Sequence, residues 1–219
     1  MILSAAGAVD HDSIVKQAEA LFGHLKPVPT PSLIEPARFV GGERREIKAL
    51  EQVHFSLAFE APNYCDPEIY TAQIYTIALG GGMSSRLFQE IRENRGLCYS
   101  IFAQTGAYED TGMNTIYAGT SSEQIAELAG ITIDEMKRAA DDMSEAEVAR
   151  ARAQMKAGLL MGLESPSNRA ERLARMLQIW GRIPPLSEAI ERIDAVTVPD
   201  VRGYAAKTVS SFGSALAVY

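Results

Sequence analysis

Cysteine and histidine, which build most zinc centres, are scarce in this sequence. It has two cysteines, Cys65 and Cys98, and three histidines, His11, His24 and His54. Two cysteines exclude a disulfide framework and are too few for a zinc site made of thiolates. No histidine has a second one four or five residues away, so neither H-x-x-E-H nor its reverse, H-E-x-x-H, occurs. We therefore expect this chain alone to bind no metal and no other cofactor.

Long apolar runs and an excess of positive charge are also missing. No run approaches the roughly 18–20 apolar residues that a membrane span requires. The formal net charge of −7 argues against a nucleic-acid partner, because phosphate binding needs clustered lysine and arginine. A hydrophobic content of 47% is enough for a sizeable core. The compartment is not readable from the sequence, and a bacterial cytoplasm and a periplasm both stay open.

Prolines mark the clearest boundary in the chain. Four of them fall within residues 24–36, at positions 27, 29, 31 and 36, which predicts an extended linker. Before it, Met1–Ala6 is typical of a short apolar strand, and Asp10 is placed to cap a helix that ends at Gly23. We predict that residues 1–36 are the closing strand and helix of a first domain plus a linker, and that residues 37–219 are a second domain.

The second domain begins with strand patterns and continues mainly with helical ones. Strands are predicted at Arg38–Lys48 and Gln52–Glu60, joined by a short turn, in a hairpin of Tyr99–Thr105 with Thr111–Gly119, and at Ser214–Tyr219. This distribution predicts an α+β fold, with helices packed on one face of a largely antiparallel sheet. The closing strand resembles the opening one, as expected if this domain is the second copy of a duplicated domain.

Helix boundaries follow from capping residues. Helices are predicted from about Pro67 to Leu79 and from Ser84 or Ser85 to Gly96. Two later helices are expected to begin at capping boxes, Ser121-x-x-Gln124 and Ser144-x-x-Glu147. Two more are expected to begin at Ser165-Pro166 and at Thr197.

Between the first two of these helices lies the segment Gly80-Gly81-Gly82. A phosphate-binding loop is excluded, because no G-K-[ST] follows and no strand precedes it. Two interpretations stay open from the residues. The segment is either a flexible loop beside a substrate channel or a helix break that uses unusual backbone angles.

Arg92 and Tyr99 are the strongest candidates for chemistry. Arg92 is predicted near the end of a helix and Tyr99 at the start of the next strand, with Gly96 in the turn between them. Such a turn can bring a guanidinium and a hydroxyl to one side, where both would donate hydrogen bonds to a peptide carbonyl and its oxyanion. The alternative is a surface arginine and a tyrosine that packs on the strand.

Several segments resemble one family. L-G-G-G-M-S-S-R-L-F-Q-E-I-R-E-N-R-G-L-C-Y-S, at residues 79–100, is similar to the signature segment of the second domain in bacterial homologues of mitochondrial processing peptidase. The opening I-L-S-A-A-G-A-V-D-H-D resembles the strand and helix that close the first domain of these proteins. The chain therefore resembles the C-terminal half of a pitrilysin/insulysin-type zinc metallopeptidase.

The resemblance implies a division of labour between two halves that close like a clamshell around a peptide. The N-terminal half, absent here, would hold zinc through H-x-x-E-H. The C-terminal half would contact the substrate through an arginine and a tyrosine seven residues later, the spacing of Arg92 and Tyr99. Gly80, Gly81 and Gly82 correspond to a substrate-binding loop of related subunits, although the loop here is shorter.

Two parent proteins fit this resemblance. The parent is either an active zinc metalloendopeptidase, with this chain inactive by itself, or a non-catalytic partner or scaffold subunit. A stand-alone peptide-binding module is a third alternative. The expected partners are a peptide substrate and an N-terminal half or partner subunit, and the expected assembly is a dimer.

Overall fold

The structure is a computed structural model that describes residues 1–26, 35–210 and 213–219. The chain divides into two compact units, which are described separately. Unit 1 comprises residues 1–36 and 157–185, and unit 2 comprises residues 37–156 and 186–219. Most of the predicted linker lies outside the described residues, and the assignment of residues 1–36 to a preceding domain stays a prediction.

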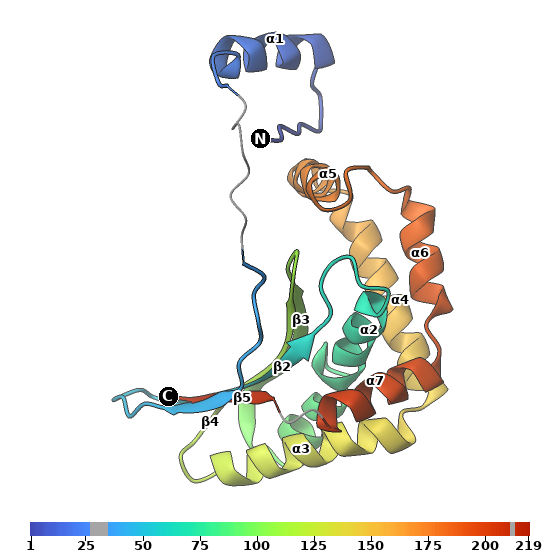
Figure 1. Ribbon diagram of the computed structural model, residues 1–219. Helices are drawn as coiled ribbons and strands as arrows, with labels where there is room; N and C mark the ends of the chain where they lie inside the picture. The colour runs from blue at the N-terminus through green and yellow to red at the C-terminus, as the bar shows by residue number, and fades with distance from the viewer. Residues whose placement is uncertain (27–34, 211–212) are drawn as a thin grey trace. The chain divides into compact units, whose positions relative to one another are not determined.

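Unit 2 is built on a five-stranded sheet (Figure 1). Its strands are β1 (Gly42–Arg45), β2 (Val53–Ala61), β3 (Cys98–Ala107), β4 (Gly112–Thr120) and β5 (Ser214–Val218), in the order β1-β5-β2-β4-β3. Only the β1–β5 pair is parallel among these described strands. Helices pack on the sheet, so the predicted α+β class with a largely antiparallel sheet is confirmed. The predicted hairpin is confirmed as β3 and β4.

The two predicted strands before residue 61 are not neighbours in the sheet. β5 lies between them, parallel to β1 and antiparallel to β2. The predicted strand at Arg38–Lys48 is also reduced to the four residues of β1. Between β1 and β2, the apolar strand β5 forms hydrogen bonds along both of its edges. At the edge of the sheet it would form them along only one.

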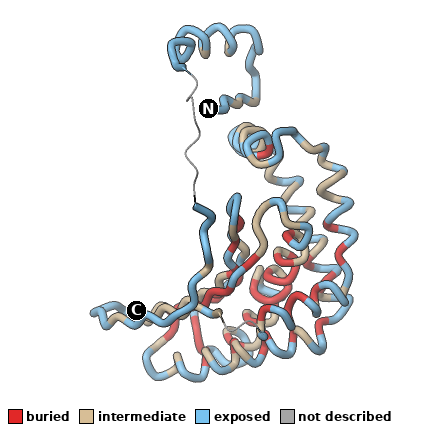
Figure 2. Tube along the Cα trace, in the orientation of Figure 1, coloured by how far each residue is buried: buried red, intermediate tan, exposed pale blue. Residues whose placement is uncertain are grey.

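Helices cover one face of the sheet and bury its apolar side chains. α2 (Ile69–Gly80) and the π-helix η1 (Phe88–Asn94) pack on β3, and α7 (Val198–Ser210) packs on α2 and on α3 (Ile125–Asp142). In β2, the side chains of Phe55, Leu57 and Phe59 recur at every second position and lie in the core, and Ala58 of the opposite face is buried as well. Figure 2 shows the buried residues gathered in these strands and helices. Helix α6 (Leu186–Ala195) was not predicted.

Capping explains where several of these helices begin. Helix α4 (Glu145–Gly162) starts with the predicted capping box, in which the Ser144 amide donates to Glu147 Oε2 over 2.8 Å and the Glu147 amide lies 3.3 Å from Ser144 Oγ. Thr197 caps α7 as predicted, through a reciprocal pair with Asp200. The predicted box before α3 is wrong, because the Ser121 hydroxyl donates to Gln124 Oε1 over 3.2 Å instead of accepting from a backbone amide.

Unit 1 contains α1 (His11–Phe22), the end of α4 and α5 (Pro166–Trp180). Asp10 caps α1 by accepting from the Ser13 amide over 2.9 Å, as the sequence predicts. Gly181, at a left-handed φ of 63°, ends α5. The strand predicted at Met1–Ala6 is wrong, because this segment joins no ladder among the described residues. α1 has no buried residue at all.

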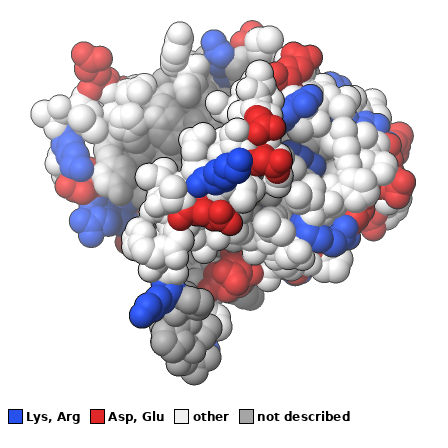
Figure 3. All heavy atoms as spheres, turned by 90° about the horizontal axis from the view of Figure 1, so that it is seen from above, with Lys and Arg blue, Asp and Glu red and all other residues white. Residues whose placement is uncertain are grey.

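Charge of both signs is spread over the surface seen in Figure 3, where lysine and arginine alternate with aspartate and glutamate. The parts of the chain that the structure describes contain no helix both long and apolar enough to cross a membrane.

Candidate functional site

The segment from Arg86 to Tyr99 is held in place by two buried side chains and one glycine. Leu87 and Ile91 are fully buried beneath the helix. Gly96 then adopts a left-handed φ of 64°, and the Leu97 amide donates to the Ile91 carbonyl over 2.9 Å. A left-handed residue strongly favours glycine. The predicted helix–glycine–strand turn is therefore confirmed, although the helix is largely a π-helix, a form often found at functional sites.

This turn brings Arg92 and Tyr99 together. Arg92 Cζ lies 5.5 Å from the centroid of the Tyr99 ring and 4.5 Å from that of Phe88. Tyr99 is 82% exposed. Across the described ranges, Arg92 has no carboxylate partner and the Tyr99 hydroxyl has no hydrogen bond. A cation and a neutral donor thus stand side by side at an accessible surface, and their catalytic roles stay predictions.

The three glycines differ from one another. Gly80 is the buried last residue of α2, where a Cβ would lie 2.6 Å from the Ala103 nitrogen of β3. Gly82 faces Gln154 of α4. None of the three has a positive φ. The interpretation based on unusual backbone angles is therefore wrong, since close packing explains Gly80. Their predicted substrate-binding role stays a prediction.

Each carbonyl of the loop at residues 81–84 already accepts a hydrogen bond. The four donors are Gln154 Nε2 to Gly81 (2.7 Å), Ser85 Oγ to Gly82 (2.6 Å), Gln89 Nε2 to Met83 (2.6 Å) and an Arg150 guanidinium nitrogen to Ser84 (3.2 Å). A pocket of about 280 Å³ lies between this loop, the end of α2 and the first turns of α4. The loop is consequently an anchored structure at the rim of a pocket.

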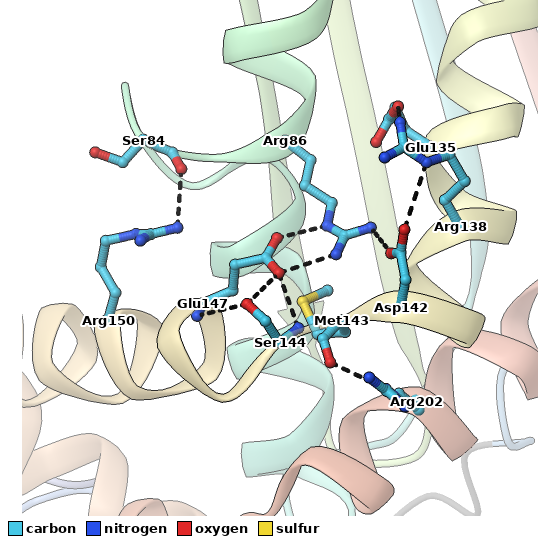
Figure 4. Close-up of polar contacts among 10 residues, drawn as sticks. All are labelled: Ser84, Arg86, Glu135, Arg138, Asp142, Met143, Ser144, Glu147, Arg150 and Arg202. Carbon is cyan, nitrogen blue, oxygen red and sulfur yellow. Dashed lines mark hydrogen bonds and ion pairs between the residues drawn. The ribbon is translucent and has the colours of Figure 1, made fainter.

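A second arginine, Arg86, has the opposite environment from Arg92 (Figure 4). Its side chain is 11% exposed and points to the first turn of α4, where Nε and a terminal nitrogen bind the two carboxylate oxygens of Glu147 at 2.6 and 2.9 Å. A third bond of 2.5 Å reaches Asp142 at the end of α3. Such a two-pronged pair is the strongest geometry available to arginine and carboxylate.

The acid strength of Glu147 reflects this contact. Burial alone would raise the pKa of its carboxyl, but hydrogen bonds from Arg86 and Ser144 outweigh burial and lower the pKa to about 2. The sequence reveals only the capping box of Glu147. No sequence signal connects it with Arg86, which lies 61 residues away.

The histidines and Cys98, the side chains most suited to bind a metal, do not lie together. His54 Nδ1 lies 2.6 Å from the Tyr117 hydroxyl, whereas His11 and His24 belong to unit 1. Cys98 is buried, and burial raises the pKa of its thiol. The residues that the structure describes contain no group of three side chains suited to a metal. They do not fit a zinc site, so no step of a reaction is assigned to zinc in this chain.

Comparison with known proteins places these features in a family. The family model of the peptidase M16 inactive domain matches residues 1–155. The chain is 38% identical over 210 residues to an uncharacterized zinc protease of Rickettsia bellii, covering 95% of this chain and 51% of that protein. It is 34% identical over 223 residues to a probable mitochondrial-processing peptidase subunit beta of Arabidopsis thaliana, covering 95% of this chain and 42% of that protein.

Solved structures agree with this result. A chain of complex III2 from Candida albicans, with Inz-5 bound, matches at a TM-score of 0.83 and 26% identity, over 96% of this chain and 52% of that one. A protease from Helicobacter pylori matches in fold at a TM-score of 0.79 and 20% identity, over 97% and 53%. The chain spans about half the length of the relatives it matches. With the predicted resemblance confirmed, the chain belongs to the peptidase M16 family, through the domain that the family model describes as inactive.

Proposed function

We propose that this chain is the substrate-binding half of a zinc metalloendopeptidase whose hydrolytic centre lies in the other half of the protein. The observation that carries the proposal is that Arg92 and Tyr99 are adjacent at the surface, and that among the described residues Arg92 has no carboxylate partner and the Tyr99 hydroxyl no hydrogen bond. A guanidinium that is not paired with a carboxylate has its donors available for a ligand. Together the two groups would donate hydrogen bonds to a peptide carbonyl and to the oxyanion that forms during hydrolysis.

The test is peptide cleavage by the full-length protein loaded with zinc. We expect Arg92→Ala to lower kcat/KM by about 100-fold and Tyr99→Phe by at least about tenfold, because each removes a donor from the transition state. Arg95→Ala is the matched control. Arg95 lies three residues away on the same turn, but its guanidinium is already paired with Glu90 and Glu127. Unchanged cleavage in both Arg92→Ala and Tyr99→Phe would overturn the proposal.

A second candidate function is a non-catalytic partner or scaffold subunit. It is favoured by the match to a chain of complex III2 and by the inactive description of the family domain. The sequence of the other half separates the two candidates, since an H-x-x-E-H motif there supports hydrolysis and its absence supports the scaffold. A scaffold would also bind peptides without cleaving them in the zinc-loaded assay.

We also propose that residues 1–22 complete a preceding domain and that the two halves close around the peptide. α1 carries an apolar face yet buries nothing, with Leu21 63% exposed. An uncovered apolar face of this kind needs a partner surface. Amides of α1 should therefore exchange slowly with deuterium in the full-length protein and rapidly in the isolated chain. Equal rates in the two would contradict this assignment.

A further inference from the structure

The helical segment that carries Arg92 is tied at both of its ends to helix α3. At its start, Arg86 bonds Asp142, the last residue of α3, over 2.5 Å. At its end, Arg95 pairs with Glu127, in the first turn of α3, over 3.5 Å. Arg92 lies between these two ties, within the π-helix η1. Its position therefore depends on how firmly each end of the segment is held.

The two ties differ in strength. The side chains of Arg95 and Glu127 are 45% and 56% exposed, and an exposed ion pair contributes little to stability. Arg86 is only 11% exposed, and it also bonds both carboxylate oxygens of Glu147 in the first turn of α4. A two-pronged pair of this kind fixes direction as well as distance. We call Arg86, Asp142 and Glu147 the Arg86 clamp, which holds the start of the segment to two helices.

Apolar packing beneath the segment does not by itself set its orientation. Leu87 and Ile91 are fully buried, but apolar contacts have no preferred direction. Arg86, the neighbour of Leu87, points to the start of α4 and the end of α3 (Figure 4). The Arg86 clamp therefore also sets how far the segment is rotated about its own axis. That rotation decides whether Arg92 lies beside Tyr99, where its Cζ is 5.5 Å from the centroid of the ring.

We propose that Glu147 and Asp142 are positioning residues for Arg92, which act through Arg86 and the helical segment that the two arginines share. This inference rests on the proposed function, in which Arg92 binds a peptide carbonyl. Among the described residues Arg92 has no carboxylate partner of its own, so its position comes from the backbone that carries it. A displacement of about 1 Å at a catalytic group is enough to cost up to about 100-fold in rate.

The experiment is a double-mutant cycle in the full-length, zinc-loaded protein. Glu147→Gln keeps the size of the side chain but removes the charge that Arg86 binds. We expect kcat/KM for a fluorogenic peptide to fall about 10-fold, mostly through kcat, because an oxyanion donor acts in the transition state. In an Arg92→Ala background the same substitution should cost less than about 2-fold, since the group that it positions is already gone. A merely structural role would lower cleavage equally in both backgrounds.

Asp142→Asn is a second, milder variant, because Asp142 supplies only one of the three bonds to Arg86. Its other pair, with Arg138, is exposed. We expect this variant to fold and to lower kcat/KM about 2- to 3-fold. Glu127→Gln is the matched control at the other end of the segment, and it should leave cleavage unchanged. Normal cleavage in both clamp variants would overturn the proposal, as would an equal loss with and without Arg92.

Hydrogen exchange separates a failure of this inference from a failure of the proposed function. The Leu97 amide donates to the Ile91 carbonyl, so its exchange reports on the end of the segment that carries Arg92. By NMR, Glu147→Gln should accelerate this exchange about threefold more than that of the β2 amides, which report global unfolding. Equal acceleration at both places would overturn the inference. Normal cleavage by Arg92→Ala would instead contradict the proposed function, and the exchange rates would still show whether the Arg86 clamp holds the segment.

Discussion

Arg86 and Arg92 lie six residues apart on the same helical segment, yet they have opposite roles at the residue scale. Arg86 is nearly buried and has three short bonds to Glu147 and Asp142. Arg92 stacks over Phe88 and Tyr99, and no carboxylate of the residues that the structure describes pairs with it. A buried guanidinium costs solvation and is retained only where carboxylates compensate it. Arg86 therefore holds structure together, and Arg92 is left available to a ligand.

Glu147 should make stability depend on pH in acid. Its folded pKa of about 2 lies below the ordinary value of 4.5, so its contribution is complete above pH 4.5 and is lost as pH falls toward 2. When the pH falls from 6 to 3, the unfolding free energy of the wild type should decrease by about 2 kcal/mol more than that of the Glu147→Gln variant. Urea titrations at each pH measure this difference.

Glu145→Gln is the control for that titration. Glu145 lies on the same first turn of α4 and pairs with Arg152, but its side chain is 68% exposed, and an exposed ion pair contributes little to stability. The pH dependence of this variant should match that of the wild type. A Glu147→Gln protein with the full wild-type dependence would show that the Arg86 pair is not formed in solution.

At the scale of elements, α2 approaches β3 so closely that only glycine fits at position 80. A Cβ there would lie 2.6 Å from the Ala103 nitrogen and 2.7 Å from its Cβ, both on a strand in the core. Neither atom belongs to a flexible side chain, so the helix or the strand would have to move. At this contact α2 ends, and the loop at residues 81–84 begins.

We expect Gly80→Ala to lower the unfolding free energy by about 2 kcal/mol, because overpacking forces a backbone shift. Gly130→Ala is the matched control inside α3, where a Cβ would meet no atom within 4 Å. That change should raise the unfolding free energy by about 0.5–1 kcal/mol, since alanine loses less backbone entropy in a helix. Chemical denaturation measures both. Equal effects of the two substitutions would argue against the close α2–β3 contact.

At the scale of the whole molecule, the chain spans about half the length of the relatives it matches. It spans 51% of the Rickettsia bellii protein and 52% of the Candida albicans chain. The described residues do not gather a metal site, and α1 buries none of its apolar side chains. Under the proposal made above, another part of the protein would complete unit 1 and would hold zinc.

The metal content of purified protein tests that arrangement. We expect the isolated chain to contain far less than one zinc ion per molecule, and the full-length protein to contain roughly one. The reason is that tight zinc binding needs three or four ligands in one place. Elemental analysis after dialysis measures the ratio. Stoichiometric zinc in the isolated chain would refute the division of labour between the halves.

Local sequence signals predicted much of this structure. Asp10, Ser144 and Thr197 cap helices as expected, because a cap depends on a side chain and an amide three residues away. The turn at Gly96 was likewise predictable from the sequence, because it depends on the backbone angles of a few neighbouring residues. The closeness of Arg92 and Tyr99 followed from that turn alone.

Contacts between distant segments were decided by the tertiary structure. The insertion of β5 between β1 and β2, the bond of Arg86 to Glu147 and the approach of Gly80 to Ala103 join residues far apart in the chain. The Met1–Ala6 strand failed for the same reason, because a strand exists only where a neighbour supplies the other half of its ladder. Local sequence patterns determine which secondary structure a segment favours, whereas burial and pairing with distant segments determine which one it adopts.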